Sequence, residues 1–156
     1  MNASFVICDK IMSFFEHTQR DTRQILVVDD ENDNLEFLSD IFSKMGYETV
    51  TAVSGIKGLN LFIKSDFGLV FTDSKMILKD GFSLAYHVKA KSPETPVVML
   101  IGQEKEDPPD KKEGCCIDDL LFKPFGLKDI QYTLQKFFMA HSGGEGVDFH
   151  CNLKAL

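Results

Sequence analysis

The feature that most constrains the fold is an acidic residue at the end of a short apolar run. Asp73 directly follows residues 68–72, which read Gly-Leu-Val-Phe-Thr. The run is short and holds β-branched and aromatic side chains, so it predicts a buried β-strand. Ligands of open α/β sheets bind at the carboxyl ends of the strands, and Asp73 therefore stands at a position typical of a functional site.

Two other apolar runs also end in charged residues. Asp29 and Asp30 follow residues 25–28, and Lys123 follows residues 120–122. If these strands lie side by side in one parallel sheet, their carboxyl ends share one edge. The sequence thus predicts that three acids and one lysine form a single site.

The remaining chain alternates between strand and helix patterns. Short apolar runs alternate with segments whose apolar residues recur every three or four positions. This pattern predicts an α/β fold with a doubly wound, five-stranded parallel sheet, right-handed crossovers and helices on both faces. The predicted strands are 24–29, 48–52, 68–73, 96–101 and 117–122, and the predicted helical segments are 33–45, 55–64, 80–91, 103–114 and 127–140.

The ends of the chain differ from this middle part. Residues 1–23 form an N-terminal extension, in which the apolar spacing over residues 8–17 favours a short amphipathic helix over a poorly ordered leader. Residues 24–141 form the folded domain. Residues 142–156 begin with Ser-Gly-Gly-Glu-Gly, which predicts a flexible tail or a truncated linker.

The net charge and the cysteines indicate which cellular compartment and which classes of partner the sequence favours. The net charge is −7 and the isoelectric point is near 5.0, which argues against direct binding of nucleic acid. No run approaches the roughly 20 apolar residues of a membrane span, so no membrane contact is expected. The four cysteines show no C-x-x-C spacing and predict reduced thiols in a cytoplasmic protein.

The chemistry of the predicted site points to a metal and a phosphoryl group. Three carboxylates do not stay ionised together without a nearby cation. Magnesium fits, because it is commonly held by one or two carboxylates and a phosphate. Lys123 adds a compact positive charge, and the set suits phosphoryl transfer onto Asp73. Each piece alone is more typical of a helix cap or a loop, so the prediction depends on their combination.

The combination resembles a response-regulator receiver domain, over about residues 24–140. The spacing fits as well, with 73 − 30 = 43 positions between two of the acids and 123 − 101 = 22 from the end of the fourth strand to the lysine. The residues that carry the resemblance are Ile-Leu-Val-Val-Asp-Asp-Glu at 25–31, Asp73, Met76, Asp80, Gly81, the strand 97–101 with Gly102 after it, and Lys-Pro-Phe at 123–125.

This resemblance implies a flavodoxin-like fold with strand order 2-1-3-4-5. It implies that Asp73 accepts a phosphoryl group from a histidine kinase or a histidine phosphotransfer protein. Asp30 would bind Mg²⁺ directly, Asp29 would assist through water, and the backbone carbonyl of Lys75 would complete the protein ligands. Lys123 would pair with the phosphoryl oxygens.

Further consequences of the resemblance concern the surroundings of the site. The Gly102 amide would also contact the phosphoryl group, and Lys123-Pro124 would be a cis peptide. Such a domain signals rather than turning over a substrate, although it assists its own phosphorylation and dephosphorylation. The downstream protein is not indicated by the sequence, and a homodimer is left open.

Three departures from the family pattern predict an unusual response to phosphorylation. Ile101 stands where the family has Thr or Ser, and Leu120 stands where the family usually has an aromatic residue. Residues 103–114 have no apolar side chain apart from two prolines, so they predict at most one or two helical turns. A fourth, smaller difference is Ile77, which follows Met76 where a proline is common.

Two other functions remain to be weighed. A pseudo-receiver would bind a partner without phosphotransfer; Ile101 and Leu120 favour it, whereas the intact acids and Lys123 oppose it. An aspartate-nucleophile phosphatase requires a second Asp two residues after the first, and position 75 is Lys.

Overall fold

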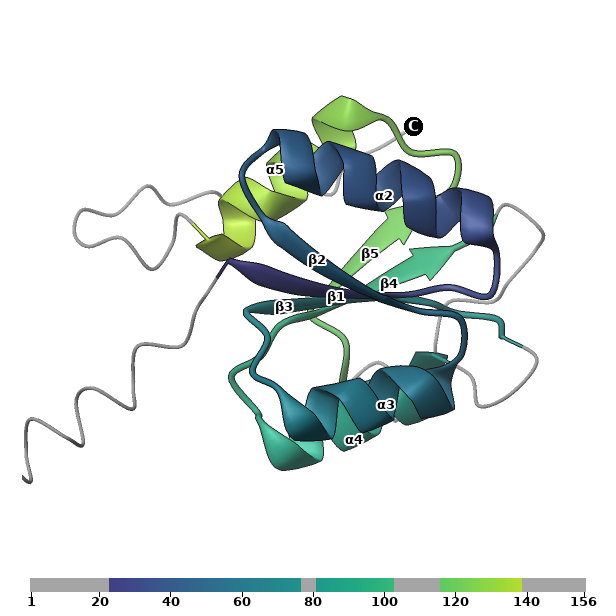
Figure 1. Ribbon diagram of the computed structural model, residues 1–156, viewed down its shortest axis with the longest axis vertical. Coiled ribbons are helices and arrows are strands. Elements are labelled where there is room, and N and C mark those ends of the chain that lie inside the picture. The colour runs from purple at the N-terminus through teal and green to yellow at the C-terminus, as the bar shows by residue number, and fades with distance from the viewer. Residues whose placement is uncertain (1–22, 77–80, 103–115, 139–156) are drawn as a thin grey trace, which may run out of the picture.

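The protein is built on one five-stranded parallel sheet with the order β2-β1-β3-β4-β5 (Figure 1). The computed structural model describes residues 23–76, 81–102 and 116–138. The predicted strand order and the doubly wound, flavodoxin-like class are both confirmed. The strands are β1 (Gln24–Val28), β2 (Glu48–Ala52), β3 (Leu69–Asp73), β4 (Val97–Ile101) and β5 (Asp119–Phe122).

Helices cover both faces of the sheet (Figure 1). Helices α2 (Asn32–Lys44) and α5 (Leu127–Phe138) lie on one face, and α3 (Gly55–Lys64) and α4 (Gly81–Lys91) lie on the other. Every residue of β3 and β4 is buried. This burial explains why these strands read as continuous apolar runs rather than as alternating ones.

One residue on each side of β2 determines the local backbone conformation there. Gly46 ends α2 with a φ of 84°, a left-handed conformation that glycine adopts without steric cost. The Ser54 hydroxyl accepts a hydrogen bond of 3.3 Å from the Lys57 amide and caps α3. Both features agree with the sequence patterns at these positions.

The largest boundary difference is at β5, which begins at Asp119 rather than at Ile117. The Asp118 carboxylate accepts a hydrogen bond of 2.7 Å from the Val97 amide and pairs with Lys89 at 2.7 Å. The Asp118 carboxylate, rather than a backbone carbonyl, thus accepts the hydrogen bond of the Val97 amide just before β5 begins. The end of α5 also lies two residues from its predicted bound, and the other element ends match the predicted bounds or shift by one residue.

Several predictions fall outside the described residues. These are the short helix over residues 8–17, the helical segment 103–114, and the tail 142–156. Within the described ranges, no helix is long and apolar enough to cross a membrane.

Candidate functional site

The charged residues predicted to form one site meet at the carboxyl edge of the sheet. Carboxylate oxygens of Asp29, Asp30 and Asp73 all lie within 4.8 Å of one another. Asp29 and Asp73 are buried, whereas Asp30 is exposed. The acids converge because β1 and β3 are neighbours in the sheet and pair in parallel, with Val28 opposite Thr72.

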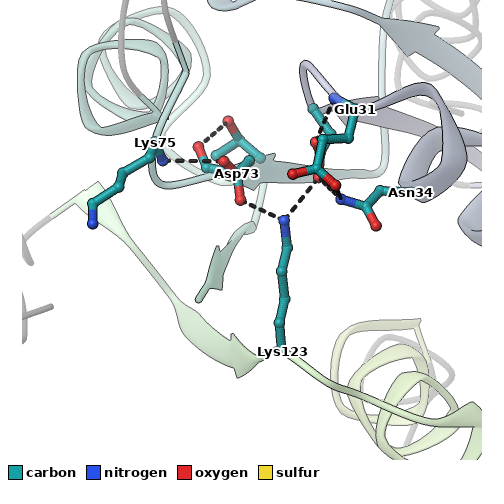
Figure 2. A network of polar contacts seen from close by, with 7 residues as sticks. Glu31, Asn34, Asp73, Lys75 and Lys123 are labelled. Atoms are coloured by element: carbon teal, nitrogen blue, oxygen red, sulfur yellow. Dashed lines mark hydrogen bonds and ion pairs between the residues drawn. The ribbon is translucent and has the colours of Figure 1, made fainter. Parts of the chain in front are cut away.

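Lys123 reaches into this cluster from the end of β5 (Figure 2). Its Nζ atom lies 2.7 Å from Asp73 Oδ1 and 3.1 Å from Asp29 Oδ2. Its backbone amide donates a hydrogen bond of 2.7 Å to the Ile101 carbonyl, which fixes the start of the side chain against β4. The peptide bond from Lys123 to Pro124 is cis, as the resemblance implies.

The Asp29 carboxylate is held by more donors than the sequence indicated. Its Oδ1 accepts from the Glu31 amide at 2.9 Å, and its Oδ2 accepts from Asn34 Nδ2 at 3.0 Å (Figure 2). Asn34 also donates to Glu31 Oε2 at 3.2 Å. With Lys123 added, both oxygens of the fully buried Asp29 are occupied.

Sequence reasoning missed the role of Asn34. The signal that would have found it is position: Asn34 lies in the first turn of α2, five residues after Asp29, where an amide side chain can reach back to the strand end. Neither Asp29 nor Asp30 is the N-cap of α2. Glu31 holds that position, and its side chain makes no capping hydrogen bond.

Asp73 is positioned by its own loop and by helix α4. Its Oδ2 accepts from the Lys75 amide at 3.1 Å, while the Lys75 side chain extends away from the Lys123 ammonium (Figure 2). Gly81, the first residue of α4, packs directly on the Asp73 backbone. A Cβ atom at position 81 would collide with the Asp73 carbonyl oxygen and come within 2.9 Å of Met99 Sδ.

Three negative charges share one positive charge in this pocket, and the pKa values reflect that imbalance. Burial raises the pKa of Asp73 above its ordinary value, the contacts with Lys123 offset this only in part, and Asp29 raises it again. Burial acts to lower the pKa of Lys123, but its contacts with Asp73 and Asp29 outweigh burial and raise it. The pocket is therefore short of positive charge, which is the condition a divalent cation would relieve.

Ile101 and Leu120, the two residues expected from the sequence to differ from the receiver pattern, lie beside the site, on the α3–α4 face. Ile101 ends β4, is only 4% exposed and belongs to the apolar cluster on that face. Leu120 of β5 is half-buried and packs against the same cluster. Gly102 follows Ile101 at the edge of the site, and a Cβ atom there would meet nothing within 4 Å. The structure thus brings Ile101 and Leu120 into one apolar layer.

Comparison with known proteins identifies the fold family. The family model for the response regulator receiver domain matches residues 25–135. The chain belongs to this family. The transcriptional regulatory protein RprY of Bacteroides fragilis is 31% identical over 115 residues, which cover 72% of this chain and 48% of RprY.

Solved receiver structures show the same arrangement of elements. Chemotaxis protein CheY4 of Vibrio cholerae superposes with a TM-score of 0.67 at 30% identity, covering 73% of this chain and 97% of CheY4. The response regulator TrrA of Thermotoga maritima, in complex with Mg²⁺ and BeF, gives a TM-score of 0.67 at 25% identity, covering 74% and 98%. This chain is therefore a receiver domain of two-component signalling. It spans less than half the length of the first curated relatives it matches.

Proposed function

We propose that the protein is a phosphoacceptor receiver in which Asp73 takes a phosphoryl group from a histidine kinase or a histidine phosphotransfer protein. The observation that carries this proposal is the position of Lys123 Nζ, 2.7 Å from one buried acid and 3.1 Å from another. In the transfer, the bond between the donor's imidazole nitrogen and phosphorus breaks, and a bond between phosphorus and an Asp73 carboxylate oxygen forms. The Lys123 ammonium neutralises charge on the transferred oxygens.

The donor set fits a magnesium ion. Three carboxylates lie within 4.8 Å of one another, and hard oxygen ligands are what Mg²⁺ prefers. Asp73 and the exposed Asp30 would hold the ion directly, with the backbone carbonyl of Lys75. Asp29 would assist through water, since both its oxygens already accept hydrogen bonds from protein donors. When bound, the ion supplies positive charge that draws the phosphoryl oxygens into the pocket.

Phosphorylation with a small donor tests the assignment of Asp73. Acetyl phosphate with Mg²⁺ is expected to add one acid-stable, base-labile phosphoryl group, detected by intact mass. Asp73→Asn is expected to abolish it, whereas Asp66→Asn, an exposed acid just before β3, leaves it unchanged. Label that persists in Asp73→Asn would place the phosphoacceptor elsewhere.

Thermal melts test the metal site separately from phosphotransfer. Millimolar Mg²⁺ is expected to raise the melting temperature of the wild type by mass action. Asp30→Asn is expected to weaken that shift, and Asp40→Asn, an exposed acid of α2, is the control. An equal shift in the wild type and Asp30→Asn would exclude Asp30 as a ligand.

The output of the domain is proposed to be unusual. Ile101 places an apolar side chain where the family has a hydroxyl, and it packs in the same layer as Leu120. These residues also support the second candidate, a pseudo-receiver that binds its partner without phosphotransfer. Beryllofluoride binding in the presence of Mg²⁺ separates the two functions, because a pseudo-receiver would not form the acyl-phosphate mimic.

A further inference from the structure

The outer edge of β2 has no strand partner among the described residues. β2 pairs only with β1. The Glu48 amide and the Ala52 carbonyl bond to backbone groups that flank β1, so both point inward. The alternation of a parallel ladder therefore turns the N–H and C=O groups of Thr49 and Thr51 outward, to the open edge.

This edge has few of the features that commonly protect edge strands. β2 reads Glu-Thr-Val-Thr-Ala, so it is short and carries one exposed charge at Glu48, but it has no proline, no lysine and no bulge in its pairing with β1. Exposed edges of this kind readily accept another strand. The sequence of β2 is thus compatible with a strand that covers it.

On the α3 side of this edge, the surface is apolar. Ile56 and Ile63 are 48% and 56% exposed, and seven residues apart they share one flank of α3. Gly58, on nearly the opposite flank, packs on Val28 of β1 and on Leu84 of α4, so the isoleucine flank faces away from both of these side chains. Val53, just after β2, is 39% exposed but lines the hollow on the α2 side, next to Thr51. Ile56 and Ile63 are therefore the apolar surface that this flank of α3 leaves exposed.

On the α2 side, the surface is a polar groove. Two adjoining hollows between α2 and β2 share Ser39 and Asp40, and Glu36 adds a second carboxylate. Thr49 lines the groove, and its hydroxyl is enclosed without a hydrogen bond within the described part of the chain. An occupant of this edge needs one apolar face and one polar face.

The sequence after α5 has this pattern. Residues 147–155 read Val-Asp-Phe-His-Cys-Asn-Leu-Lys-Ala, with apolar and polar residues in strict alternation. Such a period of two predicts a strand with one apolar and one polar face. Asp148, His150, Asn152 and Lys154 fall on the polar face, where Lys154 supplies a positive charge and His150 and Asn152 supply hydrogen-bond donors for the carboxylates of the groove. Residues 142–146 read Ser-Gly-Gly-Glu-Gly, a composition typical of linkers.

The connection from α5 to residues 147–155 is long enough to reach the β2 edge, and the resulting crossover is right-handed. The ring of Phe138, the last residue of α5, lies 4.8 Å from the ring of Tyr47, which directly precedes β2. Residues 139–146 reach up to about 26 Å when extended. This reach exceeds even the length of β2, which is about 16 Å. The crossover β1–α2–β2 already runs toward this edge over the α2–α5 face, so a parallel strand after α5 would repeat its right-handed sense.

We propose that residues 147–155 add to the outer edge of β2 as a sixth, parallel strand of the same chain. Their apolar side chains cover the isoleucine flank of α3, and their polar side chains line the groove beside α2. The outward N–H and C=O groups of Thr49 and Thr51 then gain backbone partners. This contact is independent of the phosphoacceptor site at the carboxyl edge.

Residue-resolved amide hydrogen exchange on the full chain tests the proposal. The wild type is compared with Phe149→Asp and Leu153→Asp, which place a charge on the apolar face, and with Ser142→Asp, which adds the same charge in the connection. The Thr49 and Thr51 amides are expected to exchange about tenfold faster in the first two variants than in the wild type and Ser142→Asp. The Val50 amide, which points toward β1, is expected to be unchanged in all four and so reports an intact sheet.

Two results would overturn the proposal. Equal exchange of the Thr49 and Thr51 amides in the wild type and Phe149→Asp would mean that the tail does not cover the edge. Protection that disappears on dilution of the wild type would mean that the covering strand comes from a second copy of the chain. Protection that is independent of protein concentration and lost in both tail variants supports the intramolecular strand.

Discussion

Lys123 Nζ lies 2.7 Å from Asp73 Oδ1, although the two residues are 50 positions apart in the chain. The same ammonium contacts Asp29 Oδ2 at 3.1 Å, so one side chain joins the ends of three strands. The lysine side chain is 24% exposed, whereas Asp29 is fully buried. Because of this contact, the stability of the folded protein depends on the balance of charges in the pocket.

Lys123→Met is expected to destabilise the protein in metal-free buffer. It leaves two buried carboxylates without their ammonium, and an unpaired buried charge costs about 1–3 kcal/mol in the free energy of unfolding. Mg²⁺ should recover part of the loss, because it supplies positive charge to the same oxygens. Urea unfolding in EDTA and in Mg²⁺ measures both effects. The matched control is Lys128→Met, which removes an exposed lysine of α5 and should change little.

The pH dependence of Asp73→Asn follows from the raised pKa of Asp73. Burial raises that pKa above 3.8 in the folded state, so the folded protein binds the proton more tightly than the unfolded chain does. The resulting stability is present at low pH and is lost as pH rises from 3.8 through the folded pKa. Asn stays neutral, so in EDTA the stability of Asp73→Asn relative to the wild type should increase as the pH rises above about 4. Urea unfolding across this range checks the sign, and a difference that shrinks with rising pH would contradict it.

Gly81→Ala is expected to destabilise the fold by about 1–3 kcal/mol, as overpacking of a rigid site does. The added Cβ meets the Asp73 carbonyl and Met99 Sδ, and the backbone atom cannot rotate away. Gly102→Ala is the control for stability, since a Cβ at that position meets nothing within 4 Å. Equal denaturation midpoints for the two variants would mean that α4 can move off the Asp73 backbone at little cost.

Much of the fold was predictable because the strands are buried on both faces. β4 is apolar throughout and β3 is apolar up to Thr72, and the acids at the ends of β1 and β3 mark the functional edge. The positions of Asp73, Lys123 and the acid pair follow from parallel strands ending at one edge. Amphipathic patterns also predicted the four described helices to within two residues.

The rest depends on contacts between residues distant in sequence or on side-chain geometry. The Asn34 contact with Asp29 requires the turn between β1 and α2 to bring the amide back over the strand end. The start of β5 depends on the hydrogen bond that the Asp118 carboxylate accepts from the Val97 amide. The spacing of apolar residues does not indicate this bond. The close contact between Gly81 and the Asp73 backbone likewise depends on how α4 packs against the end of β3.

A further prediction concerns Ile101, which the resemblance to receivers places where a Thr or Ser hydroxyl is expected. A hydroxyl at this position would donate a hydrogen bond to the phosphoryl group, and isoleucine has no donor. One charge-assisted hydrogen bond contributes about 1.5–3 kcal/mol, comparable to a typical coupling energy between two sites of about 1–3 kcal/mol. The wild type should therefore show beryllofluoride-induced chemical-shift changes near Asp73 but small ones in β5 and α5. Large changes across β5 and α5 of the wild type would show that the switch is intact.

Restoring the family pair is expected to restore a larger response. Ile101→Thr supplies the donor, and Leu120→Tyr supplies an aromatic ring in the same apolar layer, so the double variant should extend the shift changes into β5 and α5. Ile101→Val keeps the β-branched shape without a hydroxyl, and it is the matched control that should respond like the wild type. Asp73→Asn in the double-variant background should remove the response. A double variant that binds beryllofluoride without any wider shift changes would mean that the response is limited by another element of the pocket, such as the close contact between Gly81 and the Asp73 backbone.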